Sequence, residues 1–159
     1  MEEEAAAAPR RRRLCLGFTP MWDNEFQRTI ALHMRVVPSS IPKAGRGVVW
    51  QGPAPLPAKR LIGVYAGRMY PSDAYIRDTS LALDVQRPRP HVVVALRAKG
   101  GHNWTRFIND PWRTRRKANV EFTDRGRLKT LRRIVPGEEL FVHYGKAYCE
   151  AFMGAQVEK

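Results

Sequence analysis

Short extended segments separated by glycine and proline dominate this chain and limit the folds open to it. The sequence holds 12 glycines and 12 prolines among 159 residues. Runs rich in β-branched and aromatic residues lie between them, which is typical of strands in an all-β or α+β protein. Long helical periods do not alternate with these runs, so we exclude a doubly wound α/β nucleotide-binding fold.

The strands can be placed from these runs. The expected strands are 34–37, 47–50, 61–65, 81–85, 92–96, 119–122, 128–134 and 140–144. Pro88 and Pro90 mark a turn between two of them, and Pro136 with Gly137 marks a turn before the last. The expected helices are 23–33 and 146–153.

The length and composition predict one domain with a single core. Residues 1–20 are expected to form a disordered, Arg-rich tail because they offer no apolar face to bury. The domain then covers 21–154, and 155–159 form a second tail. The four arginines at 10–13 fit a nuclear-import patch and a solvated tail equally well. No uninterrupted apolar run approaches the roughly 20 residues that cross a bilayer, so no membrane association is expected.

The net charge of +13 and the pI of about 10.5 indicate a polyanionic partner such as chromatin. An Arg-rich composition without any such partner is the alternative. Only two cysteines occur, Cys15 and Cys149, so we expect neither a zinc site nor a disulfide framework. A reducing compartment fits this cysteine content best.

The segment Asn103-Trp-Thr-Arg-Phe-Ile-Asn109 is the first candidate for a binding site. Arg106 can pair with a carboxylate, and Asn109 can satisfy an adenine edge or another polar group. Trp104 and Phe107 supply π surface against which a cationic group can pack. A buried polar turn with satisfied hydrogen bonds is the alternative interpretation.

Three further motifs stand out along the chain. Ala44-Gly-Arg-Gly47 allows close approach of the backbone to a bulky ligand, although a simple hairpin turn would use the same glycines. Tyr65-Ala-Gly67 ends an apolar run, where a tyrosine is otherwise a core or rim residue. Leu140-Phe-Val-His-Tyr144 follows the turn at 136–137.

Together the four motifs resemble those of the SET domain, including its PR-domain relatives, over roughly residues 36–152. The resemblance implies a mostly β (α+β) fold, the SET-domain β-clip of several small sheets. It also implies few short helices and a C-terminal pseudoknot, in which the last segment threads through a loop. The implied activity is S-adenosylmethionine-dependent protein-lysine N-methyltransfer, with a histone or another basic protein as the expected substrate.

The resemblance also assigns the site. Tyr144 takes the catalytic position. The residues expected to bind S-adenosyl-L-methionine are Gly45, Arg46, Gly47, Trp104, Arg106, Asn109, Asp110 and Tyr144. The residues expected to line the substrate channel are Tyr65, Phe107, Val142 and Tyr148. No metal is expected. Glu138 and Glu139 are not candidate bases, because an exposed turn is expected there.

The chain departs from the family pattern at several positions. Asp110 replaces the usual histidine, and a basic stretch at 111–117 replaces the usual Ser-Cys stretch. Val142 stands where relatives carry Phe or Tyr, which predicts a roomier channel and transfer of more than one methyl. His143 replaces a common Asp and is interpreted as an orienting or surface residue. Since zinc-binding flanks are absent from the sequence, the terminal helix with Tyr148 and Phe152 is expected to close the channel.

The expected partner is a protein substrate with a target lysine, and the chain is expected to be a monomer. We expect it in the nucleus, with the cytoplasm as the alternative. The main rival hypothesis is a PR-like module whose catalysis has decayed and which binds nucleic acid or nucleosomes through its basic surface. Asp110 and Val142 favour the rival, whereas Tyr144, Arg106 and Asn109 favour the enzyme.

Overall fold

The computed structural model of the protein describes residues 15–96 and 103–153. Its strands are β1 (Gly17–Phe18), β2 (Met34–Pro38), β3 (Arg46–Trp50), β4 (Leu61–Val64), β5 (Gly67–Pro71), β6 (Ala82–Val85), β7 (His91–Ala95), β8 (Val120–Phe122) and β9 (Arg127–Thr130). Its helices are α1 (Glu25–His33), the 3-10 helix η1 (Trp104–Phe107), α2 (Lys146–Tyr148) and the π-helical turn η2 (Cys149–Met153).

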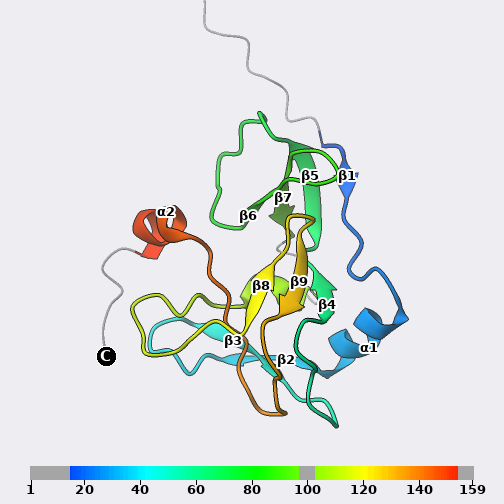
Figure 1. The fold of residues 1–159 in the computed structure, drawn as a ribbon. Coiled ribbons are helices and arrows are strands. Elements are labelled where there is room, and N and C mark those ends of the chain that lie inside the picture. Colours follow the sequence, from blue (N-terminus) through cyan, green and yellow to red (C-terminus); the bar gives the residue numbers. More distant parts are fainter. Residues whose placement is uncertain (1–14, 97–102, 154–159) are drawn as a thin grey trace, which may run out of the picture.

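Within the described residues, the strands form three small antiparallel sheets (Figure 1). One sheet has the strand order β1-β5-β7-β6, the second has the order β4-β9-β8, and the third is the hairpin β2-β3. The hairpin lies at the opposite end of the molecule from the four-stranded sheet, and β4, β9 and β8 lie between them (Figure 1). This arrangement confirms the expected mostly β fold of several small sheets with few short helices.

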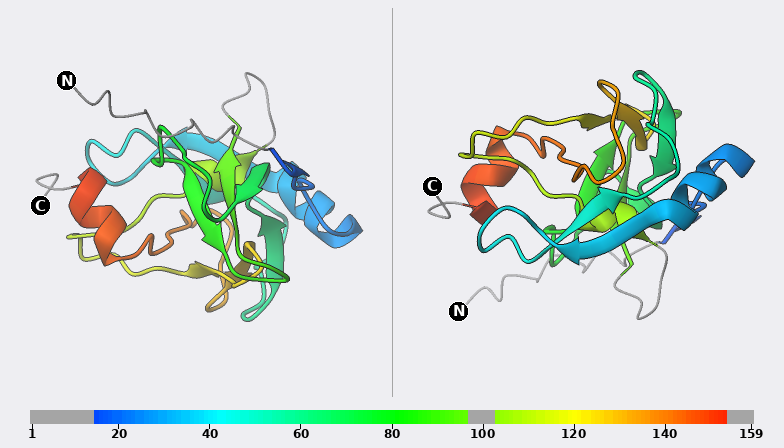
Figure 2. Two further views of the ribbon diagram at one scale, coloured as in Figure 1. Left: turned by 90° about the horizontal axis from the view of Figure 1, so that it is seen from above. Right: turned by 90° about the horizontal axis from the view of Figure 1, so that it is seen from below.

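The helix α1 begins at a capping pair of side chains. Asn24 accepts a hydrogen bond from the backbone N–H of Gln27 at 2.9 Å, and the Gln27 side chain accepts one from the N–H of Asp23 at 2.8 Å. These bonds satisfy N–H groups that have no partner within the helix. The helix turns Ile30 inward and lies beside β4 (Figures 1 and 2).

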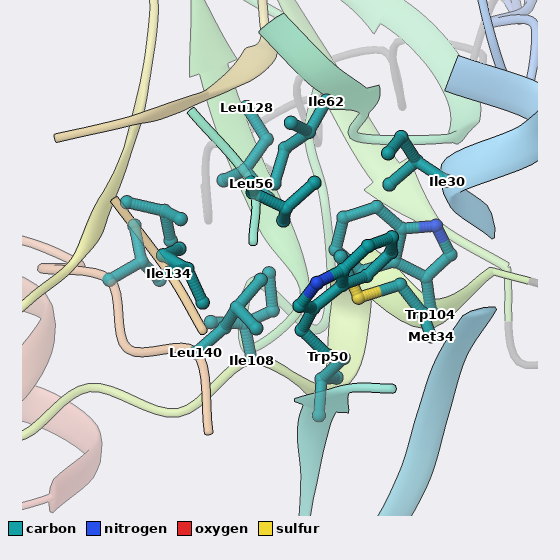
Figure 3. Close-up of a cluster of buried hydrophobic side chains, with 13 residues drawn as sticks. Ile30, Met34, Trp50, Leu56, Ile62, Trp104, Ile108, Leu128, Ile134 and Leu140 are labelled. Carbon is teal, nitrogen blue, oxygen red and sulfur yellow. The ribbon is translucent and has the colours of Figure 1, made fainter. Parts of the chain in front are cut away.

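One large hydrophobic cluster joins elements from both ends of the chain (Figure 3). Its buried members are Ile30, Met34, Val48, Trp50, Leu56, Ile62, Trp104, Ile108, Val120, Leu128, Ile134, Leu140 and Val142. Burying a side chain of this size stabilises a protein by roughly 1.5–3 kcal/mol relative to leaving it in water. The cluster therefore fixes the segment around 140–142 against the rest of the domain.

No helix among the described residues has the length and apolar character needed to cross a membrane.

The chain between Glu139 and Tyr144 crosses between two other segments, as the resemblance implies for the C-terminal end. On one side Val142 donates its N–H to the carbonyl of Asn109 at 3.0 Å. On the other side Phe141 donates to the side-chain oxygen of Asn119 at 2.8 Å, and Asn119 donates its amide to the carbonyl of Glu139 at 2.9 Å. The third and last motifs of the sequence are thereby brought side by side.

Some sequence predictions were wrong in detail. Residues 15–20 were assigned to a disordered tail, but Gly17 and Phe18 pair with β5 and cover its edge. The strand predicted over 128–134 ends at Thr130, after which Ile134 forms only a single bridge with Leu56. The strand predicted over 140–144 is likewise absent: within it only Phe141 forms an isolated bridge, with Asn109. The predicted tails at 1–14 and 155–159 lie outside the described residues.

Candidate functional site

Two neighbouring cavities lie where the motifs meet. The first, here called the tyrosine cavity, has a volume of about 370 Å³ and contains Tyr65 and Tyr144 in its lining. The second, called the Asn109 cavity, has a volume of about 400 Å³ and is lined by Ala44, Arg46, Phe107 and Asn109. Both cavities share the residues Ser80, Leu81, Arg106 and Tyr148. These shared residues form the wall between them.

Each tyrosine of the site donates its hydroxyl proton to a backbone carbonyl. Tyr65 donates to the carbonyl of Leu81 at 2.7 Å, Tyr144 donates to that of Ile108, and Tyr148 donates to that of Ser80. A phenol oxygen that has donated its proton can still accept a hydrogen bond. The tyrosine cavity is therefore lined by oriented acceptors within an otherwise largely apolar surface.

Burial keeps these phenols neutral. Desolvation raises the pKa of Tyr65 well above its ordinary value, with a further contribution from Tyr148, while the Arg106 guanidinium acts in the opposite direction. Desolvation also raises the pKa of Tyr144, and the neighbouring Tyr148 and Tyr65 add to the effect. Neither residue can act as a proton-accepting phenolate near neutral pH.

The Asn109 cavity combines cationic, amide and aromatic groups. The side-chain N–H of Asn109 donates to the carbonyl of Arg46 at 2.8 Å, which ties the third motif to β3. The guanidinium of Arg106 lies over the ring of Phe107, 4.0 Å from its centre. A ligand carrying a carboxylate, a hydrogen-bonding heterocycle and a cationic centre would find complementary groups here.

The glycines of the first motif shape this cavity without lining it. A Cβ atom on Gly47 would lie 2.1 Å from the Glu139 carboxylate and 3.3 Å from the Asn109 amide nitrogen, so a larger residue there would displace the Glu139 carboxylate and press on Asn109. Gly45 has a φ of +71° and turns the loop before β3. Of the predicted cofactor residues in this motif, Arg46 alone lines the Asn109 cavity.

Several predicted site residues lie elsewhere. Trp104 is a core residue because η1 turns its ring against Gly63, where an added Cβ would lie 2.7 Å from the ring. Val142 is also in the core and lines neither of the two cavities, so its side chain does not set the width of either. The prediction of several methyl transfers loses its basis with it.

Two assignments to a particular side of the site also change. Phe107, predicted for the substrate channel, lines the Asn109 cavity instead. Tyr144, predicted to serve both sides, lines the tyrosine cavity and not the Asn109 cavity.

Asp110 turns its carboxylate into the protein, with a side-chain exposure of 1%. Tyr148, predicted for the substrate channel, lines both the tyrosine cavity and the Asn109 cavity, whereas the side chain of Phe152 lies outside what the structure describes.

The sequence alone did not reveal some lining residues. Ser80–Leu83, at the start of β6, and Glu121, on β8, face the tyrosine cavity together with Leu131. Glu139 was also underestimated: it accepts hydrogen bonds from the hydroxyls of Ser39 and Ser40 and from the N–H of Ser40. The lining residues on β6 and β8 could have been found from the edge position of these strands in their sheets, but strand order is not visible in a single sequence.

Comparisons with known proteins agree with this geometry. The chain matches the family described as PR domain zinc finger protein 2, PR domain, over residues 34–155. Among solved structures, 136 chains match. They include the methyltransferase domain of human PR domain-containing protein 2, with a TM-score of 0.51 and 21% sequence identity over 80% of this chain and 90% of that one. A search of curated proteins gave no match.

The small sheets, the crossing C-terminal segment and the two adjoining cavities define a methyltransferase-like fold of the SET class. The chain belongs to the PR domain family, which is related to the SET domains. Among residues 15–96 and 103–153, no three His, Cys, Asp or Glu side chains gather in a way that could hold a metal ion.

Proposed function

We propose that this protein is an S-adenosylmethionine-dependent protein-lysine N-methyltransferase. The observation that carries the proposal is the pair of cavities with a common wall at Arg106 and Tyr148. Such an arrangement allows a cofactor on one side and a lysine side chain on the other to approach each other through that wall. The cofactor and the lysine would meet only when each has entered from its own cavity.

The Asn109 cavity fits the cofactor by its donor set. The guanidinium groups of Arg46 and Arg106 can pair with the amino-acid carboxylate, and Asn109 can bind a polar edge. The rings of Phe107 and Tyr148 can pack against adenine or beside a positive charge. When bound, S-adenosylmethionine supplies a methyl group on a positively charged sulfur. The cavity volume of about 400 Å³ is in the usual range for small-molecule sites.

The tyrosine cavity fits a lysine side chain. Its lining of Leu81, Leu83, Val120 and Phe122 suits the aliphatic stem and disfavours the charged ammonium form, which lowers the lysine pKa. Tyr144 and Tyr65 donate to backbone carbonyls, so their oxygens can accept hydrogen bonds from the amine and orient its lone pair. These residues position a neutral nucleophile rather than remove its proton.

The substrate we propose is a histone or another basic protein, with a ribosomal or other nonhistone protein as the less favoured choice. The net charge of +13 fits a protein that works near polyanions. On this basis we place the activity in the nucleus, with the cytoplasm as the alternative, and we propose that the protein acts as a monomer.

The test begins with binding. Isothermal titration calorimetry of the wild-type protein with S-adenosylmethionine should give a saturable isotherm, and Asn109→Ala should weaken it because Asn109 lines the cofactor cavity. Labelled-methyl transfer to core histones should then be detected with the wild type and lost with Tyr144→Phe. A wild type that binds no cofactor would exclude the enzyme.

One observation favours a second function, docking on nucleic acid. Arg113, Arg115, Arg116 and Lys117 are exposed on one loop beside the C-terminal motif. A chain that binds DNA with steep salt dependence but does not bind the cofactor would be the PR-like docking module. Measuring DNA affinity at two salt concentrations alongside the calorimetry separates the two functions.

A further inference from the structure

Asp110 is a buried carboxylate at the point where three segments meet. Its side chain is only 1% exposed, whereas a carboxylate on the surface would keep its hydration. A buried carboxylate is tolerated only when hydrogen bonds replace its lost hydration. The contacts that do so here all reach it from the loop that follows it and from the C-terminal segment.

Four groups surround the two carboxylate oxygens. The Oδ1 atom accepts the N–H of Trp112 at 2.7 Å and lies 3.7 Å from Nδ1 of His143. The Oδ2 atom accepts the N–H of Tyr144 at 2.7 Å and the thiol of Cys149 at 3.2 Å. Tyr144 and Cys149 lie on either side of Gly145, where the chain turns with a φ of +97° into α2. The carboxylate therefore holds both ends of this turn.

The consequence for the site is geometric. Tyr144 occupies its place through its own N–H bond to Asp110 and its hydroxyl bond to the carbonyl of Ile108, two residues before Asp110. The same carboxylate fixes the start of the helical segment that carries Tyr148 into the wall between the cavities. One side chain thus bonds the chain on both sides of the segment that carries the two aromatic rings.

We infer that Asp110 is the positioning residue of the site, a clamp that sets Tyr144 and the C-terminal helical segment through backbone and thiol hydrogen bonds. Its side chain is buried and lines neither cavity, so in this inference it acts through Tyr144 and Cys149 and not through contact with a cofactor. The role in catalysis rests on the proposed function, whereas the clamp itself does not. Asp110→Asn tests both. The asparagine amide has only one acceptor oxygen, so at least one of the two backbone N–H groups would face the amide's own N–H group and lose its acceptor.

The first test does not involve activity. Amide hydrogen exchange followed by NMR should find the N–H groups of Trp112 and Tyr144 protected in the wild type. At least one of the two should exchange about tenfold faster in Asp110→Asn, since loss of one good hydrogen bond corresponds to that order. Thr130→Val is the matched control. Thr130 is fully buried and bonds the carbonyl of Pro57, so it perturbs a buried polar site away from the clamp.

A second readout uses the thiol of Cys149, which is 1% exposed. In a Cys15→Ser background, a thiol-specific reagent should modify Cys149 faster in Asp110→Asn than in the Thr130→Val control. Burial raises the pKa of this thiol to about 12, and the hydrogen bond to Asp110 contributes to that shift. Releasing the clamp should therefore increase both access to the sulfur and its thiolate fraction.

The activity readout separates positioning from cofactor binding. Asp110→Asn should lower kcat by up to about 100-fold through misplacement of Tyr144, while the KM for S-adenosylmethionine changes little. A rise in that KM with unchanged kcat would overturn the inference in favour of a cofactor contact. Unchanged exchange and unchanged thiol reactivity would overturn the clamp.

Two further outcomes keep the inference distinct from the proposed function. Released amides in the variant, together with a wild type that transfers no methyl, would support the clamp and reject the enzyme. If Asp110→Asn does not fold, hydrogen exchange in the wild type still decides the matter. The amides of Trp112 and Tyr144 must then be protected to the same degree as each other, and rapid exchange of either one would reject the clamp.

Discussion

The rings of Tyr144 and Tyr148 meet edge to face, with centroids 5.0 Å apart and an angle of 71° between their planes. This contact joins the last motif to the C-terminal helix across Gly145. It also places the second ring in the wall between the tyrosine and Asn109 cavities. We therefore expect the width of the proposed lysine channel to depend on Tyr148, which lies in this wall, rather than on Val142 in the core.

Replacing Tyr148 with alanine should enlarge the channel and destabilise the C-terminal segment. The lost aromatic pair corresponds to about 0.5–1.5 kcal/mol beyond the buried area, and Tyr148→Phe should retain most of it. Urea denaturation would measure the stabilities. Mass spectrometry of the peptide product would report methyl number, which should rise in Tyr148→Ala if the wall limits the cavity.

Tyr75→Ala provides the control for that experiment, since Tyr75 is 69% exposed. It should leave both stability and product distribution close to those of the wild type. Equal product distributions in Tyr148→Ala and in the wild type would show that this ring does not limit the channel.

Gly47→Ala should destabilise the domain because its Cβ would lie 2.1 Å from the Glu139 carboxylate. The carboxylate cannot move away freely, since Ser39 and Ser40 both donate hydrogen bonds to it. We expect a loss of about 1–3 kcal/mol in the free energy of unfolding from the broken bonds. Weaker cofactor binding should accompany it, because Asn109 lies 3.3 Å from the same added atom.

A double-mutant cycle identifies the clash as the cause. Glu139→Ala removes the obstructing carboxylate, so Gly47→Ala should be less destabilising in that background than in the wild type. Gly45→Asn is the matched substitution in the same motif: nothing lies within 4 Å of its Cβ, and asparagine tolerates its positive φ. Additive effects of the Gly47 and Glu139 changes would reject the steric explanation.

The sequence was sufficient for the motifs and for the class of fold, because glycine, proline and period-two patterns report on the local backbone. Tyr65, Tyr144 and Asn109, which the motifs singled out, all line one of the two adjoining cavities. The sequence was insufficient for side-chain direction. Trp104 and Val142 belong to the same motifs, yet packing against Gly63 and the core turns them away from the site.

Long-range pairing explains the other differences. The lining residues at the start of β6 and on β8 come from the edge strands of two different sheets and meet only in the folded protein. Likewise the sequence shows Asp110 only as a substitution for the family's usual histidine. Its bonds to Tyr144 and Cys149 form only once the C-terminal segment has crossed beside it. These contacts join residues far apart in sequence, so local patterns cannot contain them.

Stability should fall at alkaline pH because the phenol of Tyr65 is buried. Its pKa is raised in the folded protein above the ordinary value of 10.0, mainly by desolvation. Its contribution is fully present below pH 10 and is lost as the pH rises above that value, because the unfolded chain then releases the proton first. The free energy of unfolding should fall by about 1.4 kcal/mol per pH unit for each such group.

Urea denaturation at a series of pH values from 8 to about 11 would measure this slope. Tyr65→Phe should make it shallower by the contribution of one proton. Thr105→Val removes a neighbouring buried hydroxyl that does not titrate, so it should lower stability equally at every pH. If stability falls with pH as steeply in Tyr65→Phe as in the wild type, the Tyr65 phenol is not the source of this pH dependence.

Glu121 is expected to select substrates that carry a positive charge near the target lysine. It supplies the carboxylate among the described residues that line the tyrosine cavity, and it is exposed on the edge strand β8. The cationic groups near it are Lys129, opposite it in the sheet register, and Arg106, which lines the same cavity. An exposed pair of this kind contributes up to about 1 kcal/mol, so Glu121→Gln should raise the KM for a basic peptide up to about fivefold with kcat unchanged.

Salt and a distant carboxylate provide the controls for Glu121. The difference between the wild type and Glu121→Gln should shrink as the ionic strength rises, because exposed charges are screened. Glu25→Gln changes the net charge equally but lies on α1, where Glu25 pairs with Arg28 at 3.6 Å, so its KM should match that of the wild type. If both variants raise KM alike, overall charge governs peptide binding and Glu121 has no special place in it.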